Sequence, residues 1–337
     1  MKVLIVTNML PSPENPKAGT FIEQQITSLE DIGVDLEVVL VDRANRGMGS
    51  YRATRELVGQ ARLACRPDLT HVMYGGVLSA LALDSDAREA QVVSFCGVDL
   101  LGANYGSLAY RLRTWIGRQA SLRAARKADG IIVKSKNLRE GLPAGVDPSI
   151  VSIIPNGISL DRFQPMDRTE CRRKLGWSPG VFHILFSTND RTDKKKRLPL
   201  AEAAVELCRG RGVDAEIHGL HRVPHDEVAI WLNAADVVLM TSRFDEGSPN
   251  IIKEGLACNR PVVSVDVGDV AERIDGIDGC YLADASPAAL ADKLMLVQRG
   301  RRAVDAREKI AELSLERVAR RVVDVYEQTL ERVAGRR

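Results

Sequence analysis

Short apolar segments recur along the chain, and stretches with a helical or polar pattern separate them. The apolar segments lie at 3–7, 36–42, 71–74, 92–96 and 130–135, and then at 183–188, 215–219, 236–242, 261–266 and 279–284. Continuously apolar strands are typical of parallel sheets that are covered on both faces. Because helical patterns lie between these segments, the alternation predicts βαβ units and an α/β fold.

Three helical patterns are clear. The first begins near Thr20, where Thr20 and Glu23 have the spacing of a capping box, and Gly33 is expected to end it. A second helix is expected over 196–209. The last follows Ser314 and carries its apolar residues on one face. No strand comes after it, so we expect this helix to pack on a sheet that is already formed.

A turn divides the chain near its midpoint. The tripeptide Pro-Asn-Gly at 155–157 follows a short apolar strand and is typical of a turn. A length of 337 residues also suggests two domains. We expect an N-terminal domain at 1–157 and a second domain at 158–315, with a C-terminal helix at about 316–337 that packs back onto the first.

The composition disfavours several classes of protein. The chain has 47 Lys and Arg against 45 Asp and Glu, without the basic surplus of a nucleic-acid-binding protein. The six cysteines form no C-x-x-C pair, which predicts neither a zinc site nor a disulfide framework and fits a cytoplasmic protein. The N-terminal apolar run is short and is expected to be a strand, not a signal peptide.

Polar residues gather after the apolar segment at 236–242. Glu246 is expected in the loop at the carboxyl end of that strand. Ser248 and Pro249 suit the start of a helix, and Glu254 would lie about a turn and a half into it. Ligands of open α/β sheets bind at this edge of the sheet. The free N–H groups of a helix start favour an anion such as a phosphate.

Glu246 and Glu254, with seven residues between them, resemble the Glu-x7-Glu motif of retaining glycosyltransferases with the GT-B fold (glycosyl transferases group 1, family 4 type). The likeness is dense over about 150–284 and moderate at 17–33 and 94–102. It implies two Rossmann-like α/β domains that face each other across a cleft. The second domain would hold the donor and the first the acceptor.

The resemblance also implies a reaction. A sugar would pass from a nucleoside diphosphate donor, expected to be UDP-linked, to a hydroxyl of a sugar, a lipid-linked sugar or a small molecule. The configuration would be retained. No metal and no other cofactor is expected, and nucleic acid is not expected as a partner.

Individual residues receive roles from the same resemblance. Glu254 would accept hydrogen bonds from the two ribose hydroxyls, and Glu246 would contact the donor sugar. The start of the helix would hold the diphosphate through its backbone. The residues expected there are Gly247, Ser248, Asn250 and Ile251.

The diphosphate needs cations, and the basic stretch at 189–197 is expected to supply them. Arg191 and either Lys195 or Lys196 would stabilise the negative charge of the leaving group. Which lysine points inward stays open, because Arg197 stands where relatives have glycine. The alternative is a basic loop that is only solvated.

Several other positions have two interpretations. Gly19 would approach the donor phosphates or is a plain loop glycine, and His221 would line the nucleoside pocket. Asp99 would face the acceptor or would cap a turn. Cys96 stands where many relatives carry histidine, which argues against a step that needs an imidazole. We expect Cys96 to be a small buried residue and not a nucleophile.

Histidines at 218, 221 and 225 have a spacing that would suit one face of a helix. Gly219 and Pro224 would interrupt such a helix, so the sequence predicts no metal site there.

The segment at 100–128 has no acidic residue. Its basic residues are Arg111, Arg113, Arg118, Arg123, Arg126 and Lys127, and its apolar face would comprise Leu108, Leu112, Trp115, Ile116 and Leu122. Basic amphipathic helices can lie on anionic membranes, so peripheral contact with the inner membrane face stays open. The charges spread around the helix, which favours a packed helix with solvated arginines.

Two other functional classes stay open. One is a GT-B enzyme that hydrolyses or epimerises its nucleotide sugar. The other is a non-catalytic subunit that binds a nucleotide sugar, for which the cysteine at position 96 is the best argument. A dehydrogenase is disfavoured because the chain lacks G-x-G-x-x-G in its first loop.

Overall fold

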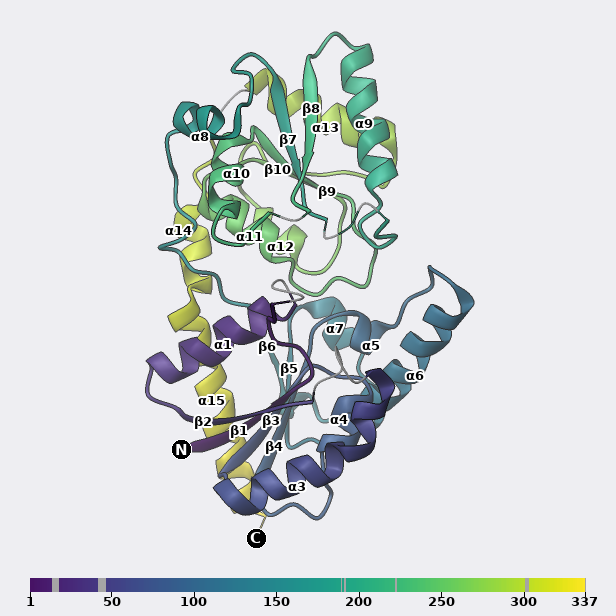
Figure 1. Cartoon of the computed structure of the whole chain (residues 1–337), viewed down its shortest axis with the longest axis vertical. Coiled ribbons are helices and arrows are strands. Elements are labelled where there is room, and N and C mark those ends of the chain that lie inside the picture. The colour runs from purple at the N-terminus through teal and green to yellow at the C-terminus, as the bar shows by residue number, and fades with distance from the viewer. Residues whose placement is uncertain are drawn as a thin grey trace. The chain divides into compact units, whose positions relative to one another are not determined.

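The chain forms two compact units, shown in Figure 1 as a computed structural model. The structure describes residues 1–13, 18–41, 47–188, 190, 192–221, 223–300 and 303–336. The first unit comprises Met1–Gly157 and Leu315–Arg337, and the second comprises Ile158–Ser314. Each unit contains one parallel sheet with helices on both faces. The prediction of two Rossmann-like α/β domains is confirmed.

The sheet of the first unit has six strands in the order β2-β1-β3-β4-β5-β6. They are β1 (Lys2–Thr7), β2 (Asp35–Leu40), β3 (Leu69–Met73), β4 (Ala90–Phe95), β5 (Gly130–Val133) and β6 (Val151–Ile153). The helices are α1 (Thr20–Asp31), η1 (Gly47–Ala53), α3 (Thr54–Cys65), α4 (Val77–Ala82), α5 (Val98–Leu101), α6 (Leu108–Ala125), α7 (Lys136–Glu140), η2 (Pro148–Ile150) and α15 (Leu315–Ala334). Strands β3, β4 and β5 are buried along their whole length, as expected for a sheet covered on both faces.

Helix α1 begins at the predicted residue but is capped differently. Gly19 precedes it, and the Gly19 carbonyl accepts hydrogen bonds from the N–H groups of Ile22 and Glu23 at 2.8 and 3.0 Å. No side chain caps this end, so the predicted capping box was wrong: Thr20 already lies inside the helix. Three residues of the apolar face are buried as the spacing predicted: Ile22, Ile26 and Leu29.

The C-terminal helix α15 packs against α1, β4 and β5. The hydroxyl of its buried Tyr326 lies 2.6 Å from Nδ1 of His71, and Nε2 of His71 lies 2.8 Å from Oγ of Ser94. Burial and the charge of Lys134 lower the pKa of His71 to about 3, so this imidazole is neutral near pH 7. The chain of polar contacts fixes the helix on the sheet, because a buried ring nitrogen without a partner costs about 1–3 kcal/mol.

The sheet of the second unit has five strands in the order β11-β10-β9-β7-β8. They are β7 (Phe182–Phe186), β8 (Ala215–Gly219), β9 (Val237–Met240), β10 (Val262–Ser264) and β11 (Tyr281–Leu282). The helices are α8 (Arg168–Leu175), α9 (Leu198–Gly210), α10 (Val228–Ala234), α11 (Asn250–Ala257), α12 (Val270–Ile274), α13 (Pro287–Gly300), α14 (Arg307–Ile310) and η3 (Ala311–Leu313). Helices α8 and α10 pack together, as do α9 and α13, and the two pairs cover opposite faces (Figure 1).

Some elements are shorter than their apolar segments. The segment at 236–242 contains only the four residues of β9, and the segment at 279–284 only the two of β11. Helix α9 begins at Leu198 and not at 196, because Arg197 adopts a left-handed conformation with φ of 55°. A residue with positive φ cannot continue a right-handed helix.

Helix α6 departs most clearly from its prediction. Its apolar face was expected to be packed, but Leu108 is 80% exposed, Leu112 and Trp115 are each 56% exposed, and Ile116 is 46% exposed. The residues of α6 that are buried are Ala120, Ser121, Ala124 and Ala125, in its second half. The first half of the helix therefore carries an apolar surface among arginines. Nowhere in the described residues is a helix long and apolar enough to span a membrane.

Candidate functional site

Two loops leave the same edge of the second sheet and bring charged side chains together. Strands β7 and β9 are parallel neighbours, so the loops after their carboxyl ends start side by side. The first loop carries Lys195 and Lys196. The second carries Glu246 and leads into α11, in which Glu254 is the fifth residue. This is the edge at which open α/β sheets bind ligands.

Glu246 is held between the two lysines. Its Oε1 lies 2.6 Å from Nζ of Lys196, and its Oε2 lies 3.2 Å from Nζ of Lys195. Burial alone would raise the pKa of Glu246, but the two ammonium groups outweigh it and lower this pKa to about 2. The carboxyl group is therefore ionised at any physiological pH. Both lysines contact Glu246, so the structure does not single out one of them.

The backbone around the lysines is tied to the neighbouring loop. Arg243 donates its N–H to the Lys195 carbonyl at 3.0 Å, and the hydroxyl of Thr241 donates to the Lys196 carbonyl at 2.6 Å. Arg197 adopts the left-handed conformation that glycine favours, and its guanidinium donates to the Thr241 carbonyl. The basic stretch is thus built into the site. Arg191, the third expected cation, lies outside the described residues.

Glu254 is buried in a different way. Only 6% of the residue is exposed, and the described residues offer its carboxylate no hydrogen bond and no ion pair. Burial raises the pKa of Glu254 to about 7, against the weaker opposing charges of Lys253 and Arg162. A buried carboxyl group without a donor is expensive for the folded protein. A ligand with two hydroxyl groups would supply the missing donors.

The start of α11 is shaped by a buried polar chain that the sequence did not reveal. Ser248 was expected to cap this helix, but its hydroxyl instead lies 2.9 Å from both Lys253 Nζ and Asp269 Oδ2. The helix starts at Asn250 without a side-chain cap. Its first N–H groups therefore have no partner within the helix. A lysine inside the apolar helix sequence NIIKEGLA was the one available signal of this chain of contacts.

Gly268 brings a second loop against the same turn. It has φ of 60°, and a Cβ atom at this position would lie 2.1 Å from the Gly247 carbonyl oxygen. Only glycine fits such a close approach of two backbones. The loop at 246–249 is therefore held by the hydrogen bond from Ser248 to Asp269 and by the close approach of Gly268 to Gly247.

In the first unit, the Asp99 carboxylate is hydrogen-bonded to backbone N–H groups. Its carboxylate accepts hydrogen bonds from the N–H groups of Gly75 at 2.9 Å, Cys96 at 3.1 Å and Gly97 at 2.6 Å. This geometry agrees with the second interpretation of Asp99, in which its carboxylate caps a turn. Burial raises the pKa of Asp99 and these amides oppose the rise. Burial also raises the pKa of the Cys96 thiol to about 12, which argues against a nucleophile. Cys96 is only partly buried, so the expectation of a buried residue was wrong.

Lys134 is a buried charge that sequence reasoning missed. It follows β5 directly, is 1% exposed, and lies 3.5 Å from the side-chain oxygen of Gln25. Burial lowers the pKa of its ammonium group, while the charges of Cys96 and Asp99 oppose that shift. The position of a lysine right after an apolar strand was the only signal in the sequence.

Gly19 has a local structural explanation. At Gly19, φ is 69°, and a Cβ atom would lie 2.4 Å from the carbonyl oxygen of Met9, so this position requires glycine whatever it binds. His221 lies just after β8, and Nδ1 of its ring is buried without a hydrogen-bond partner in the described part of the chain. His225 instead packs edge-on against Phe163, with ring centroids 5.8 Å apart.

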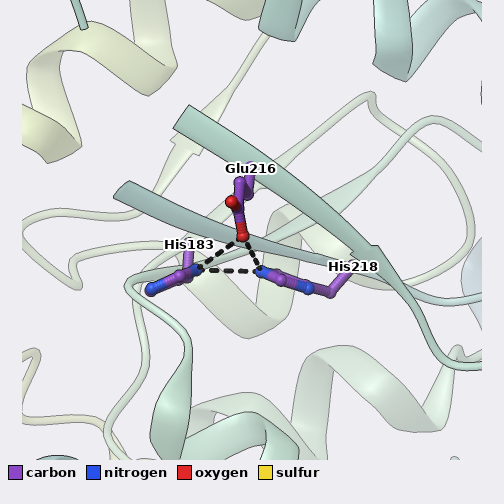
Figure 2. Close-up of side chains that lie close together, drawn as sticks. All are labelled: His183, Glu216 and His218. Atoms are coloured by element: carbon purple, nitrogen blue, oxygen red, sulfur yellow. Dashed lines mark hydrogen bonds and ion pairs between the residues drawn. The ribbon is translucent and has the colours of Figure 1, made fainter. Parts of the chain in front are cut away.

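His218 belongs to a group that the sequence did not predict. It lies with His183 and Glu216, from two neighbouring strands, as Figure 2 shows. No spacing in the sequence indicates this group, because it depends on the register of β7 against β8.

Two family models match the chain. A glycosyltransferase family 4 model matches residues 3–162, and a model of glycosyl transferases group 1 matches residues 193–298. The first covers most of Met1–Gly157 and extends five residues into the second unit. The second covers the loops with Lys195 and Glu246 and the helix with Glu254.

Relatives of known name agree with these models. The chain is 24% identical to TuaC of Bacillus subtilis, a glycosyltransferase attributed to teichuronic acid biosynthesis, over 87% of the chain and 88% of TuaC. It is 31% identical to a D-inositol 3-phosphate glycosyltransferase of Pseudarthrobacter chlorophenolicus. That match covers 47% of the chain and 46% of the relative, about half the length of each.

Solved structures share the fold at low sequence identity. Sucrose-phosphate synthase from Thermosynechococcus elongatus superposes with a TM-score of 0.77 at 15% identity, covering 97% of the chain and 99% of that structure. HepE from Anabaena in complex with UDP gives 0.69 at 17% identity, with 97% and 100% covered. The UDP-GlcNAc 2-epimerase of Methanocaldococcus jannaschii gives 0.59 at 11% identity, with 97% and 100% covered. Both family models are thus glycosyltransferase models, and the chain shares the GT-B fold with these solved structures.

Proposed function

We propose that the chain transfers a sugar from a UDP-linked donor to an acceptor hydroxyl with retention of configuration, and that the donor binds in the second unit. The observation that carries this proposal is the pair of buried carboxylates at one sheet edge, one ion-paired with two lysines and one without a partner among the described residues. The HepE structures are complexes with UDP, with UDP and glucose, and with UDP-glucose, which supports a donor of this class.

Glu254 is the proposed acceptor of the two ribose hydroxyls. A carboxylate can accept one hydrogen bond on each oxygen, and hydrogen bonds to charged groups contribute about 1.5–3 kcal/mol each. Binding would also favour the ionised form, because the hydroxyls replace the water that burial removes. A nucleotide would thus relieve the unfavourable burial of this side chain.

Lys195 and Lys196 are the proposed cations for the leaving diphosphate. Bond cleavage between the anomeric carbon and the diphosphate oxygen leaves negative charge on that oxygen, and preorganised ammonium groups stabilise it. The proposed donor site therefore needs no metal. Glu246 would keep the lysines in place and bind a hydroxyl of the sugar.

The acceptor proton is proposed to leave with the diphosphate. The bond between the acceptor oxygen and the anomeric carbon forms on the face from which the diphosphate departs, and a phosphate oxygen takes the proton. Glu246 is a poor base because its pKa is about 2. The Cys96 thiol has a pKa of about 12 and stays protonated, and three backbone amides donate hydrogen bonds to the Asp99 carboxylate. This combination favours the phosphate as the base.

A UDP-GlcNAc 2-epimerase has the same fold. A second candidate reaction is therefore epimerisation or hydrolysis of the UDP-sugar without an acceptor. The family models favour transfer. Incubation with UDP-glucose alone distinguishes the two classes: fast release of UDP without an acceptor would contradict transfer as the main activity.

The acceptor side is proposed to contact an anionic lipid surface through α6, in a protein that works in the cytoplasm. Leu108, Leu112, Trp115 and Ile116 are exposed, and arginines flank them. Basic residues beside an exposed apolar stripe suit the headgroup region of an anionic bilayer. Such contact would suit a lipid-linked acceptor.

Replacement of Glu254 by glutamine should stabilise the protein without ligand at alkaline pH. The pKa of Glu254 is about 7 in the folded protein and 4.5 ordinarily, so as the pH rises the unfolded chain loses this proton first. Wild-type stability therefore falls between about pH 4.5 and 7, by up to about 3 kcal/mol, and Glu254→Gln escapes this loss. Urea unfolding should show a more stable variant at pH 8 and equal stability at pH 4. Glu206→Gln, an exposed control, should change neither; a variant no more stable than wild type at pH 8 would contradict the unpaired burial of Glu254.

Calorimetry with UDP should separate the two glutamates. Glu254→Ala should weaken UDP binding by about 10- to 100-fold, from the loss of charged hydrogen bonds. Glu246→Ala frees two lysines for the diphosphate, so UDP affinity should hold or rise while the preference for UDP-glucose over UDP falls. Glu206→Ala serves as the control. An equal loss of UDP affinity in both site variants would reject the division of roles, and loss of wild-type binding in EDTA would reject a metal-independent donor site.

Sedimentation with lipid vesicles should test α6. The wild type should bind vesicles that contain phosphatidylglycerol more tightly than vesicles of phosphatidylcholine alone. The double variant Leu112→Gln with Trp115→Gln should bind the anionic vesicles at least about tenfold more weakly, because each large apolar side chain contributes about 1.5–3 kcal/mol when buried. Leu296→Gln, on the exposed surface of α13, is the matched control. If the control and the double variant bind equally, α6 is not the contact.

A further inference from the structure

His183, Glu216 and His218, hereafter the histidine–glutamate cluster, share one face of the second sheet. In the parallel register, His183 of β7 lies opposite Glu216 of β8, and Leu185 lies opposite His218. Residues opposite each other in parallel strands point to the same face, as do residues two apart in one strand. Figure 2 shows the three side chains converging on one point.

The three converging atoms have the separations of a metal ligand set. Nδ1 of His183 lies 2.9 Å from Nε2 of His218, and Oε2 of Glu216 lies 3.8 and 3.5 Å from these two nitrogens. A triangle with these sides has a point about 2.0 Å from all three corners, which matches the usual Zn–N distance of about 2.0–2.1 Å and Zn–O distance of about 2.0–2.2 Å. A single ion therefore fits without movement of the strands.

The surroundings orient the rings as in metal sites. The other nitrogen of His183, Nε2, lies 2.8 Å from the Ser178 carbonyl oxygen and donates its hydrogen there. This contact leaves a lone pair on Nδ1, which points into the cluster, and such a contact to a carbonyl is typical of histidines that bind metals. Trp177 stacks on His218 with centroids 3.7 Å apart and fixes the second ring.

The charge balance of the cluster also suits a cation. Arg172, the nearby cation, is paired with Asp236 at 2.7 Å. The Glu216 side chain is half exposed and brings one negative charge. Two imidazoles and one carboxylate, with access to solvent, leave room for water as a fourth ligand.

This cluster is separate from the lysines and glutamates of the proposed donor site. His183 stands at the start of β7, and the loop with the lysines follows its other end, three residues and about 10 Å further along the strand. The cluster connects β7 with β8, which is the edge strand of the sheet.

We propose that His183, Glu216 and His218 bind one Zn²⁺ ion that ties the edge strand β8 to β7. This ion adds a metal site outside the proposed transfer reaction. The sequence did not predict it, because the histidines at 221 and 225 that seemed to accompany His218 lie elsewhere.

The test is Zn²⁺ binding by the full chain. Protein freed of metal with a chelator and then desalted is titrated with Zn²⁺ against a chromophoric competitor, and Co²⁺ is used in parallel for its visible absorption. The variants are His218→Gln and Glu216→Gln, and Glu206→Gln is the control, an exposed carboxylate of the same unit. Circular dichroism and UDP binding verify that each variant folds.

The wild type and the control should bind one equivalent of Zn²⁺, show Co²⁺ bands of a low-coordinate site, and gain thermal stability with Zn²⁺. Glu216→Gln should bind at least about tenfold more weakly and His218→Gln more weakly still, with UDP binding unchanged. Equal Zn²⁺ affinity in wild type and both variants would overturn the proposal, as would a wild type without saturable binding at micromolar free Zn²⁺. Neither result depends on whether UDP is the donor.

Discussion

The structure of the second unit depends on the burial of two carboxylates at one edge of a sheet. Burial of a charge is expensive unless partners compensate it. Glu246 receives two ammonium groups and stays ionised. Among the residues that the structure describes, Glu254 receives none, and burial raises its pKa to about 7. Folding alone gives no reason to keep an uncompensated carboxyl group in a helix. This difference between the two carboxylates is understandable if a ligand donates hydrogen bonds to Glu254, whereas the protein's own lysines pair with Glu246.

The surrounding polar contacts preserve this asymmetry. The carbonyls of both lysines are bonded to the loop after β9, so Glu246 and its partners form one unit. Ser248 connects Lys253 with Oδ2 of Asp269, while Oδ1 of Asp269 is buried without a hydrogen-bond partner among the described residues. With those contacts made, the amides at the start of α11 and the carboxylate of Glu254 remain available on the same helix. A nucleoside diphosphate has complementary groups for both, since it carries an anionic diphosphate and a ribose with two hydroxyls.

Much of this arrangement was predictable from the sequence, and the remainder depends on three-dimensional contacts. Alternating apolar strands and helices predicted the fold class, and the strand before Glu246 placed this residue in a loop at the sheet edge. Two predicted helix caps were wrong, at Thr20 and at Ser248, because a capping residue type also serves inside a helix or in a buried polar chain. The exposed face of α6 looked like a core-facing stripe, since periodicity alone cannot tell which surface covers a helix. The histidine–glutamate cluster was invisible because strand register joins residues that are distant in sequence.

The central claim is that the edge with Glu254 and Glu246 binds the nucleotide, and a crystal structure of the protein with UDP tests it most directly. The account predicts both ribose hydroxyls within hydrogen-bond distance of the Glu254 carboxylate. It also predicts the diphosphate at the amides that begin α11, beside the ammonium groups of Lys195 and Lys196. A nucleotide bound at another place, or bound here with its ribose turned away from Glu254, would contradict the account.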